Sequence, residues 1–468
     1  MNVTQQEIKE QAEIALSLRT VFAGKKGMVR TFGCQQNEAD GERILGELAD
    51  CGLTPTEELS EADVVILNTC AIREHAEQRV LGIIGSMKKE KEKRPDLLIG
   101  MCGCMAQERH RQDLLMQSYP FVDFLFGTDR HHRVPEILRE ALRSRKQRQF
   151  VTDLPHNEFG VISEGTPVCR DSTYKAKVSV MYGCNNFCSY CIVPYVRGHE
   201  RSRASAQVLE EVGSLVQADY KDIMLLGQNV NSYRGDVDFP TLLEKCASFP
   251  GDYWGRFMTS HPKDASPALV RVMAEQPKVA KHFHLPFQSG NDRILSAMNR
   301  KYNREQYLEK ALAIKEQVQD VSLTSDVIVG FPTETEKEFL DTVELVKQVG
   351  FDMLYTFIYS PRKGTVAEKM EGRIPHEEQV RRFSYLSDVQ NEIAQRNNDA
   401  FVGKVLTVLS EGVNEKGIPT GRSSGNKIVT FDTLKARAAF DPPVPQGTFC
   451  KVKTDTARQY ALSGSVQD

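Results

Sequence analysis

The sequence of 468 residues has no long apolar run and no marked excess of either charge. None of its hydrophobic stretches approaches the roughly 20 residues that a membrane-spanning helix needs, and residues 1–26 are too polar for a secretory signal. We therefore expect a cytoplasmic protein with no membrane partner. The formal net charge of -3 neither indicates nor excludes binding to nucleic acid, because that affinity follows local patches of charge.

The sequence also lacks the cysteine spacing of a disulfide framework. Its 11 cysteines are spread irregularly along a long chain, which favours metal or redox chemistry in a reducing compartment. The hydrophobic share of 40% and the charged share of 26% are typical of a globular protein. The length predicts two or three domains.

Cys184, Cys188 and Cys191 follow an apolar, β-like run at CxxxCxxC spacing. One loop of this kind suits three thiolates around a cubic iron–sulfur cluster, and one iron then stays open to a small molecule because such clusters take four ligands. A zinc site is the alternative, but the residues that follow supply no second CxxC pair. With Tyr190 before the last cysteine, the motif resembles the radical S-adenosylmethionine (SAM) signature, in which the open iron chelates the amino and carboxylate groups of SAM.

Residues 27–145 alternate short apolar runs with longer amphipathic ones, which predicts an open parallel α/β domain. Residues 1–26 are predicted to be a helical extension. Cys34, Cys70 and Cys104 each follow a predicted strand, and ligands of open α/β sheets gather at that edge. The pattern predicts a second cluster with one open iron.

Two alternatives stay open for these cysteines. Three coincidental buried thiols are one, because free cysteine is commonly buried. The other is that Cys102 is the ligand instead of Cys104, because it lies two residues earlier and points to the same side of an extended segment. Position alone does not choose between Cys102 and Cys104.

Residues 146–173 contain several glycines and prolines with little periodicity and are predicted to be a linker. Residues 174–398 then show six strand–helix units, which predicts an open, partial (β/α)6 barrel with its site at the carboxyl ends of the strands. Polar residues and glycines at these ends suit contacts with a nucleoside cofactor. The candidates are Tyr190, Gly227, Gln228, Asn229, Ser260, His284 and Gln288.

Residues 401–464 form short alternating runs bounded by glycines, which predicts a small antiparallel β-barrel. The sequence from Phe401 to the end contains nine Lys and Arg residues and six Asp and Glu residues, an excess of positive charge. A basic barrel is suited to clamping nucleic acid; the alternative is an ordinary solvated surface.

With these segments in place, residues 27–463 resemble the methylthiotransferases, which combine an α/β domain with three cysteines, a radical-SAM partial barrel and a C-terminal TRAM domain. The motifs that carry the resemblance are Thr31–Glu38, Asn68–Arg73, Gly103–Gln107, the cysteine loop with Pro194–Gly198, the run Arg197–Arg203, Ser260–Pro262 and Gln288–Gly290.

The resemblance implies two [4Fe-4S] clusters and two SAM molecules per turnover. The cluster on Cys184, Cys188 and Cys191 cleaves SAM to a radical that abstracts hydrogen from the substrate, and the cluster on Cys34, Cys70 and Cys104 carries the sulfur. In the family pattern Cys104 is the third ligand, which leaves Cys102 a bystander or a reserve ligand.

The implied substrate is N6-isopentenyladenosine beside the anticodon of tRNA, at position 37, which receives a methylthio group on carbon 2. Threonylcarbamoyladenosine in tRNA and an aspartate of a ribosomal protein are the alternative substrates, and a zinc-stabilised RNA-binding protein is the alternative outside enzymes. The expected partners are the tRNA anticodon stem-loop and an electron donor such as flavodoxin or ferredoxin, acting on a monomer.

Two geometric expectations complete the interpretation. Arg197, Arg201 and Arg203 follow the cysteine loop and are placed to touch phosphates, with a solvated cationic strand end as the alternative. We also expect both cysteine triads to open into one cavity, roofed by the C-terminal barrel.

Overall fold

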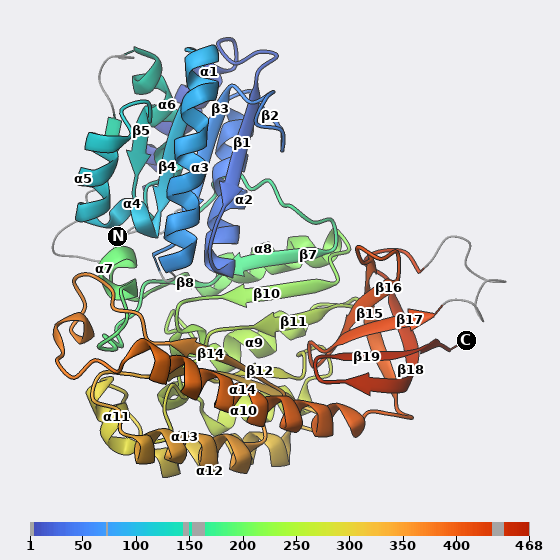
Figure 1. Cartoon of the computed structure of the whole chain (residues 1–468). Coiled ribbons are helices and arrows are strands. Elements are labelled where there is room, and N and C mark those ends of the chain that lie inside the picture. The colour runs from blue at the N-terminus through green and yellow to red at the C-terminus, as the bar shows by residue number, and fades with distance from the viewer. Residues whose placement is uncertain (1–3, 72–73, 144–148, 152–163, 433–443, 468) are drawn as a thin grey trace. The chain divides into compact units, whose positions relative to one another are not determined.

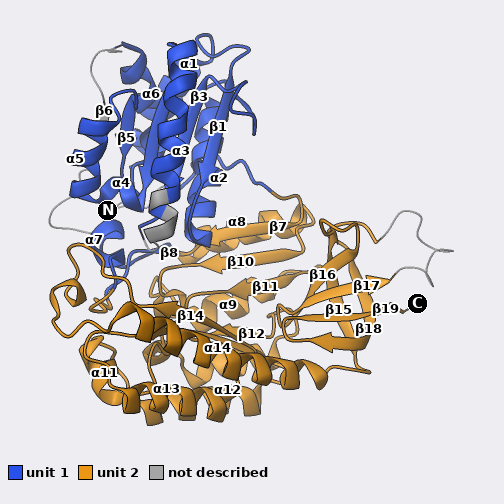
Figure 2. Ribbon diagram, viewed as in Figure 1, with its two compact units in different colours: residues 1–171, 181–185, 191–203 blue, residues 172–180, 186–190, 204–468 orange. Residues whose placement is uncertain are grey.

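The structure is a computed structural model that describes residues 4–71, 74–143, 149–151, 164–432 and 444–467. Ile72 and Arg73 of the quoted motifs, residues 146–148 and 152–163 of the predicted linker, and the charged residues Lys435, Arg437 and Asp441 lie outside the described residues. The chain divides into two compact units (Figure 2). Unit 1 holds Met1–Asp171, Met181–Asn185 and Cys191–Arg203, and unit 2 holds Ser172–Val180, Asn186–Tyr190 and Ala204–Asp468.

Unit 1 is built on a six-stranded parallel sheet of order β2-β1-β3-β4-β5-β6 (Figure 1). Its strands are β1 (Lys26–Thr31), β2 (Thr54–Pro55), β3 (Val64–Thr69), β4 (Leu98–Gly103), β5 (Phe124–Phe126) and β6 (Gln149–Val151). Its helices are α1 (Gln5–Leu18), α2 (Gln35–Asp50), α3 (Glu74–Lys93), α4 (Cys104–Gln107), α5 (Arg109–Ser118), α6 (Val134–Arg143) and α7 (Val193–Arg197). A two-stranded ribbon, β8 (Met181–Tyr182) with β9 (Arg201–Ser202), completes it.

The central strands β3 and β4 are buried along their whole length, as expected for a parallel sheet with helices on both faces. One apolar core includes Leu48 of α2 and Ile66 of β3, and a second includes Val65 of β3 and Ile84 of α3. Neighbouring β3 residues thus belong to opposite cores because side chains alternate along a strand. The predicted α/β architecture is confirmed. Strand β6 lies inside the segment that was predicted to be a linker.

Unit 2 contains the six predicted strands of the partial barrel. They are β7 (Lys175–Ser179), β10 (Asp222–Leu226), β11 (Trp254–Phe257), β12 (His282–His284), β13 (Ser322–Val329) and β14 (Met353–Ile358). They pair in parallel as two three-stranded sheets, β11-β10-β7 and β12-β13-β14, and an isolated parallel bridge joins Gly255 to Val279 between them. The covering helices are α8 (Ser205–Gln217), α9 (Phe239–Ala247), α10 (Pro267–Glu275), α11 (Asp292–Ala297), α12 (Arg304–Gln317), α13 (Glu336–Val349) and α14 (His376–Asp399).

A closed five-stranded barrel of order β15-β16-β17-β19-β18 ends the chain. Its strands are β15 (Val405–Val413), β16 (Pro419–Ser423), β17 (Ile428–Asp432), β18 (Phe449–Arg458) and β19 (Ala461–Val466). The predicted small barrel is confirmed, with one difference from a purely antiparallel barrel. Strand β17 pairs in parallel with β19, while the other pairs are antiparallel.

The C-terminal barrel packs on the amino ends of the partial-barrel strands, within unit 2. Phe449 meets Trp254, the first residue of β11, with ring centroids 4.7 Å apart. Lys427 bonds Asp352 immediately before β14, at 2.6 Å. Lys175, the first residue of β7, bonds Glu411. The expected roof over the active-site mouth is therefore wrong, because the mouth lies at the opposite, carboxyl ends of these strands (Figure 1).

The predicted domain boundaries stay predictions, because the two units cut the chain differently. The C-terminal barrel shares unit 2 with the partial barrel, and the cysteine loop contributes Cys184 and Cys191 to unit 1 but Cys188 to unit 2. Within the part of the chain that the structure describes, no helix combines the length and apolar composition of a membrane span.

Candidate active site

Three cysteines of unit 1 lie at the carboxyl edge of its sheet. Cys34 caps the start of α2 after β1, Cys70 directly follows β3, and Cys104 begins α4 after β4. Because β1, β3 and β4 are adjacent parallel strands, their carboxyl ends meet at one edge. The structure thus brings together the three residues that the sequence singled out.

Close backbone packing holds two of these cysteines beside each other. Gly33 has a φ of +131°, and a Cβ built on it would lie 2.6 Å from Cβ of Cys70 and 3.1 Å from its Sγ. Asn37 connects the segments that carry Cys34 and Cys70. Its Nδ2 donates to the carbonyl of Thr69 at 2.7 Å, and its Oδ1 accepts from Sγ of Cys34 at 3.4 Å. Glycine is needed before Cys34 because a side chain would displace Cys70.

Cys102 and Cys104 do not share a side of the strand. Gly103 adopts a φ of +89°, and a Cβ there would come within 2.3 Å of the carbonyl oxygen of Thr69. This left-handed residue ends the strand alternation. Cys102 packs into the apolar core around Phe124 and Phe126, whereas Cys104 packs with Ala71 and with residues of the segment that carries α7.

Arg197, at the end of α7, contacts Cys104 directly. Its Nε donates to Sγ of Cys104 at 3.3 Å, and its Nη2 donates to Asn37 Oδ1 and Asp40 Oδ2, both at 2.9 Å. The side chain is 4% exposed. Burial raises the pKa of the Cys104 thiol, and the positive charge of Arg197 opposes that rise.

The expected contact of Arg197, Arg201 and Arg203 with phosphates is wrong, and so is the alternative of a solvated strand end, since all three are buried. Arg203 forms a two-point ion pair with Glu164, at 2.6 and 2.8 Å. Arg201 donates to the carbonyl of Arg197 at 3.0 Å. These arginines therefore form hydrogen bonds and ion pairs inside unit 1.

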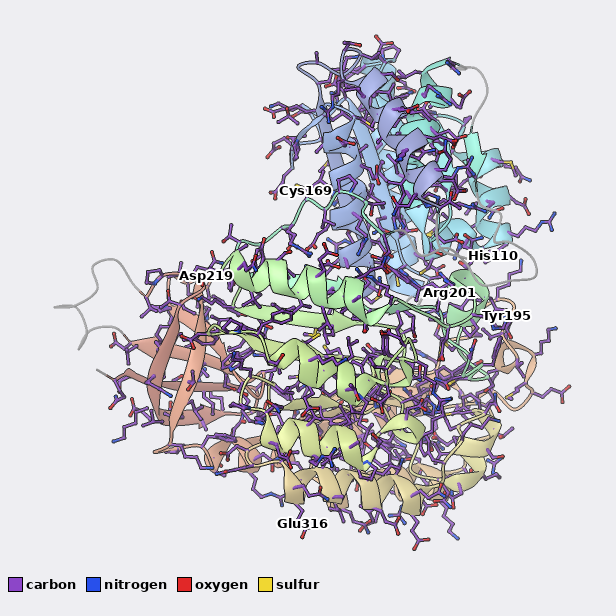
Figure 3. All side chains as sticks on the ribbon, turned by 180° about the vertical axis from the view of Figure 1, so that it is seen from behind. His110, Cys169, Tyr195, Arg201, Asp219 and Glu316 are labelled. Carbon is purple, nitrogen blue, oxygen red and sulfur yellow. The ribbon has the colours of Figure 1, made fainter. Side chains whose placement is uncertain are left out.

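The cysteine loop begins in unit 1 on a strained glycine. Gly183 has a φ of +72°, and a Cβ there would lie 2.0 Å from the carbonyl oxygen of His199. The backbone N–H of Cys184 donates to Gly198 at 3.1 Å. Cys184 is buried and Cys191 is half-buried. None of the 11 cysteines, all of which the structure describes, is in a disulfide, and Figure 3 shows Cys169 of the connecting segment apart from Arg201.

The middle of the loop, in unit 2, meets a second buried arginine. Arg300 donates from Nη1 to Sγ of Cys188 at 3.4 Å, from Nη2 to the carbonyl of Pro286 at 2.7 Å, and from Nε to the hydroxyl of Tyr302 at 2.9 Å. Tyr190 packs against an apolar cluster that includes Phe331. The sequence placed Arg197 only as a phosphate contact and did not single out Arg300, because neither lies at a strand end and arginine is usually exposed.

Several candidate cofactor residues of unit 2 carry polar atoms that suit a ligand. Among the described residues, Oδ1 of Asn229 and Oγ of Ser260 are buried without a hydrogen-bond partner. Nδ2 of Asn229 is held by Asp264 at 2.8 Å. Buried polar atoms are normally paired, so these two fit a bound nucleoside. Gly227 is buried and Gln228 half-buried beside them.

His284 and Gln288 lie at the carboxyl end of β12. Nδ1 of His284 is 3.0 Å from Oγ1 of Thr324, and its Nε2 is 3.5 Å from Asp326. Gln288 has a φ of +69°, and Thr259 and Thr333 near neighbouring strand ends have φ values of +68° and +67°. Left-handed residues other than glycine are costly and cluster at functional sites. Their concentration here supports the predicted mouth.

The residues present fit two iron–sulfur clusters by donor chemistry. Each triad offers three thiols, and in each an arginine N–H points at one sulfur. Within the described ranges, no three His, Cys, Asp or Glu side chains lie close enough together to hold a single metal ion. The cysteines of a cubic cluster lie farther apart than the ligands of one ion, because each binds a different iron.

Comparison with known proteins identifies the class first. The model of the Radical SAM superfamily matches residues 178–346, and the model described as "Uncharacterized protein family UPF0004" matches residues 26–127. The structure of the radical S-adenosylmethionine methyltransferase TsrM from Kitasatospora setae, with cobalamin and a [4Fe-4S] cluster bound, is similar with a TM-score of 0.53 at 12% identity, covering 74% of this chain and 77% of that one. Together with the six-stranded partial barrel, these matches define a radical SAM enzyme.

Full-length relatives then define the family. A tRNA-2-methylthio-N(6)-dimethylallyladenosine synthase of Acetivibrio thermocellus is 45% identical over 96% of this chain and 92% of its own length. One of Clostridium perfringens is 46% identical over 86% and 91%, and one of Thermoanaerobacter sp. is 44% identical over 92% of both chains. The chain belongs to this family of radical SAM methylthiotransferases, which decides against the zinc-stabilised binding protein.

Proposed function

We propose that the chain adds a methylthio group to carbon 2 of N6-isopentenyladenosine at position 37 of tRNA, beside the anticodon. The corresponding product, 2-methylthio-N(6)-dimethylallyladenosine in tRNA, is the one named for relatives that share 44–46% identity with the chain. One structural observation carries the proposal. Cys34, Cys70 and Cys104 gather at one sheet edge, and Arg197, six residues after Cys191, contacts Cys104.

The clusters and SAM, when bound, supply the electron, the radical, the sulfur and the methyl group. Cys184, Cys188 and Cys191 hold one cluster, and Cys34, Cys70 and Cys104 hold the other. Asn229 and Ser260 orient the nucleoside of SAM through their buried oxygens. His284 and Gln288 line the same mouth, where the buried setting limits water.

The C-terminal barrel serves tRNA binding from a distance. It sits on the amino ends of the partial-barrel strands, away from the mouth. Lys451, Lys453 and Arg458 are exposed along β18 together with one anion, Asp455, and an excess of cations suits a phosphate backbone. The C-terminal barrel therefore binds a part of the tRNA other than the target base. Flavodoxin or ferredoxin as electron donor, a monomeric state, and work in the cytoplasm complete the proposal.

Nucleoside analysis of tRNA from a deletion strain tests the substrate. We expect 2-methylthio-N6-isopentenyladenosine to disappear, N6-isopentenyladenosine to accumulate, and the intact gene to restore the modification. Normal methylthio levels in the deletion strain would contradict the proposal. Loss confined to threonylcarbamoyladenosine species would assign that alternative substrate instead, and loss of a methylthio group from a ribosomal-protein aspartate, read by mass spectrometry of the ribosomal proteins, would assign the other.

A further inference from the structure

Each cysteine triad has one buried arginine that donates to one of its sulfurs. Nε of Arg197 lies 3.3 Å from Sγ of Cys104, and Nη1 of Arg300 lies 3.4 Å from Sγ of Cys188. The two arginines are 4% and 9% exposed. The first pair lies within unit 1 and the second within unit 2, so the same arrangement arises twice.

Both guanidinium groups are fixed by other partners, so their contact with sulfur is not incidental. Arg197 is anchored by the carboxylate of Asp40 and the amide oxygen of Asn37. Arg300 is anchored by the carbonyl of Pro286 and the hydroxyl of Tyr302. In each case a further N–H of the same guanidinium donates to the cysteine sulfur. The anchors differ in charge, because Asp40 offsets Arg197 whereas the two anchors of Arg300 are neutral.

Burying a guanidinium is costly unless negative charge or good acceptors surround it. A thiolate bound to iron supplies both. Reduction adds an electron to the cluster, so a nearby cation and an N–H···S hydrogen bond stabilise the reduced form more than the oxidised one. Hydrogen bonds to sulfur and net charge are among the factors that set the reduction potential of such clusters.

We propose that Arg197 and Arg300 are positioning residues that orient one cysteine ligand of each cluster and raise that cluster's reduction potential. This inference rests on the proposed function only in taking both triads as cluster ligands. Each arginine acts on its own cluster. Arg300 raises the potential of the SAM-cleaving cluster toward that of its electron donor, and Arg197 does the same for the sulfur-carrying cluster.

The test measures the midpoint potential of one cluster at a time in the full-length chain. A background with Cys184, Cys188 and Cys191 changed to Ala retains the cluster on Cys34, Cys70 and Cys104, and the reverse background retains the other. Three variants are made in the first background. Arg197→Met removes the charge and the hydrogen bond, Arg197→Gln keeps a hydrogen-bond donor, and Arg197→Lys keeps the charge. The matching Arg300 variants are made in the second background. Iron is counted, and potentials are read by titration monitored by electron paramagnetic resonance.

We expect a negative shift in every variant that retains its iron, largest for Met and smaller for Gln and Lys. Arg300→Met in the complete chain should leave the potential of the other cluster unchanged. Asp40→Asn supplies a control of opposite sign, because removing the negative charge beside Arg197 shifts the potential upward. A merely structural role of Arg197 would leave the potential unchanged in Arg197 variants that retain their iron.

Unchanged potentials in iron-replete Arg197 and Arg300 variants would overturn the inference. If the Met variants lose iron, the Lys and Gln variants carry the same test. No tRNA is present, so a wrong substrate leaves the result intact. A colourless, iron-free protein in either background before any arginine is changed would instead refute the proposed clusters, and with them the proposed function.

Discussion

Arg256 on β11 and Asp222 on β10 form a buried ion pair, with Nε of Arg256 2.8 and 3.0 Å from the two carboxylate oxygens of Asp222. The same guanidinium donates to the carbonyls of Ser424 at 2.8 Å and Ser423 at 3.1 Å, where β16 ends and the next turn begins. One side chain therefore links two neighbouring strands of the partial barrel to the C-terminal barrel.

Replacing Arg256 by Ala should weaken this junction. Asp222 and two carbonyls would lose a buried partner, and breaking a buried pair from one side costs about 3–5 kcal/mol. We expect a lower thermal midpoint and faster proteolytic release of the C-terminal barrel. Arg19→Ala is the control, since its pair with Asp50 is half exposed and should matter little. Equal stability of the two variants would contradict the role of Arg256 at this junction.

Removing one cysteine triad should affect a different step of the reaction from removing the other. Changing Cys184, Cys188 and Cys191 to Ala should abolish SAM cleavage, measured as 5′-deoxyadenosine. Changing Cys34, Cys70 and Cys104 should leave cleavage and remove sulfur transfer to tRNA. Protein purified without oxygen should be brown, with roughly eight irons if both clusters are cubic. Methylthiolation that survives Cys34→Ala would refute the second cluster.

Cys102 and Cys104 should respond differently to substitution. Cys102 packs in the apolar core, so Cys102→Ala should cost about 1 kcal/mol of stability and leave the iron count unchanged. Cys104→Ala should lose the iron of one cluster. Iron and sulfide analysis of the two variants decides the matter, and loss of iron from Cys102→Ala would make Cys102 the ligand.

Gly33→Ala should damage the triad through Cys70. The added Cβ would lie 2.6 Å from Cβ of Cys70, so the thiol must move and the cluster should load incompletely. Gly24→Ala is the matched control, because Gly24 also has a positive φ, +74°, but open space around it. Full iron in Gly33→Ala would show that Cys70 tolerates displacement.

Glu47 should make the stability of unit 1 fall as pH rises. Burial raises its pKa from 4.5 to about 8, with Asp50 adding to the rise and Arg43 opposing it. Between these values the folded chain keeps a proton that the unfolded chain releases, so stability decreases from about pH 4.5 to about pH 8. Each pKa unit corresponds to about 1.4 kcal/mol, so the full effect is a few kcal/mol.

Glu47→Gln should remove that dependence. We expect the variant to gain most over the parent near pH 8 and to differ little near pH 5, in thermal midpoints recorded at both. Glu61→Gln, on the surface beside Lys26, is the control. A gain of the same size at both pH values would show that deprotonation of Glu47 is not the cause of the pH dependence.

The sequence by itself determined the order of elements and the candidate chemistry. The alternation of apolar and amphipathic runs predicted the strand–helix order of residues 27–145 and the six strands of residues 174–398, because burial on a parallel sheet demands largely apolar strands. The positions of Cys34, Cys70 and Cys104 after three strands predicted their meeting at one edge. Local pattern suffices for these features.

Only the tertiary structure decided what depends on contacts between distant segments. Gly103 turns Cys104 away from Cys102 because its left-handed backbone ends the strand alternation. Arg197 and Arg300 look like surface cations in sequence but are buried against cysteine sulfurs, and the C-terminal barrel lies at the amino ends of the strands rather than over the mouth. In each case the cause is the free energy of burying and pairing groups far apart in the chain, which no local periodicity encodes.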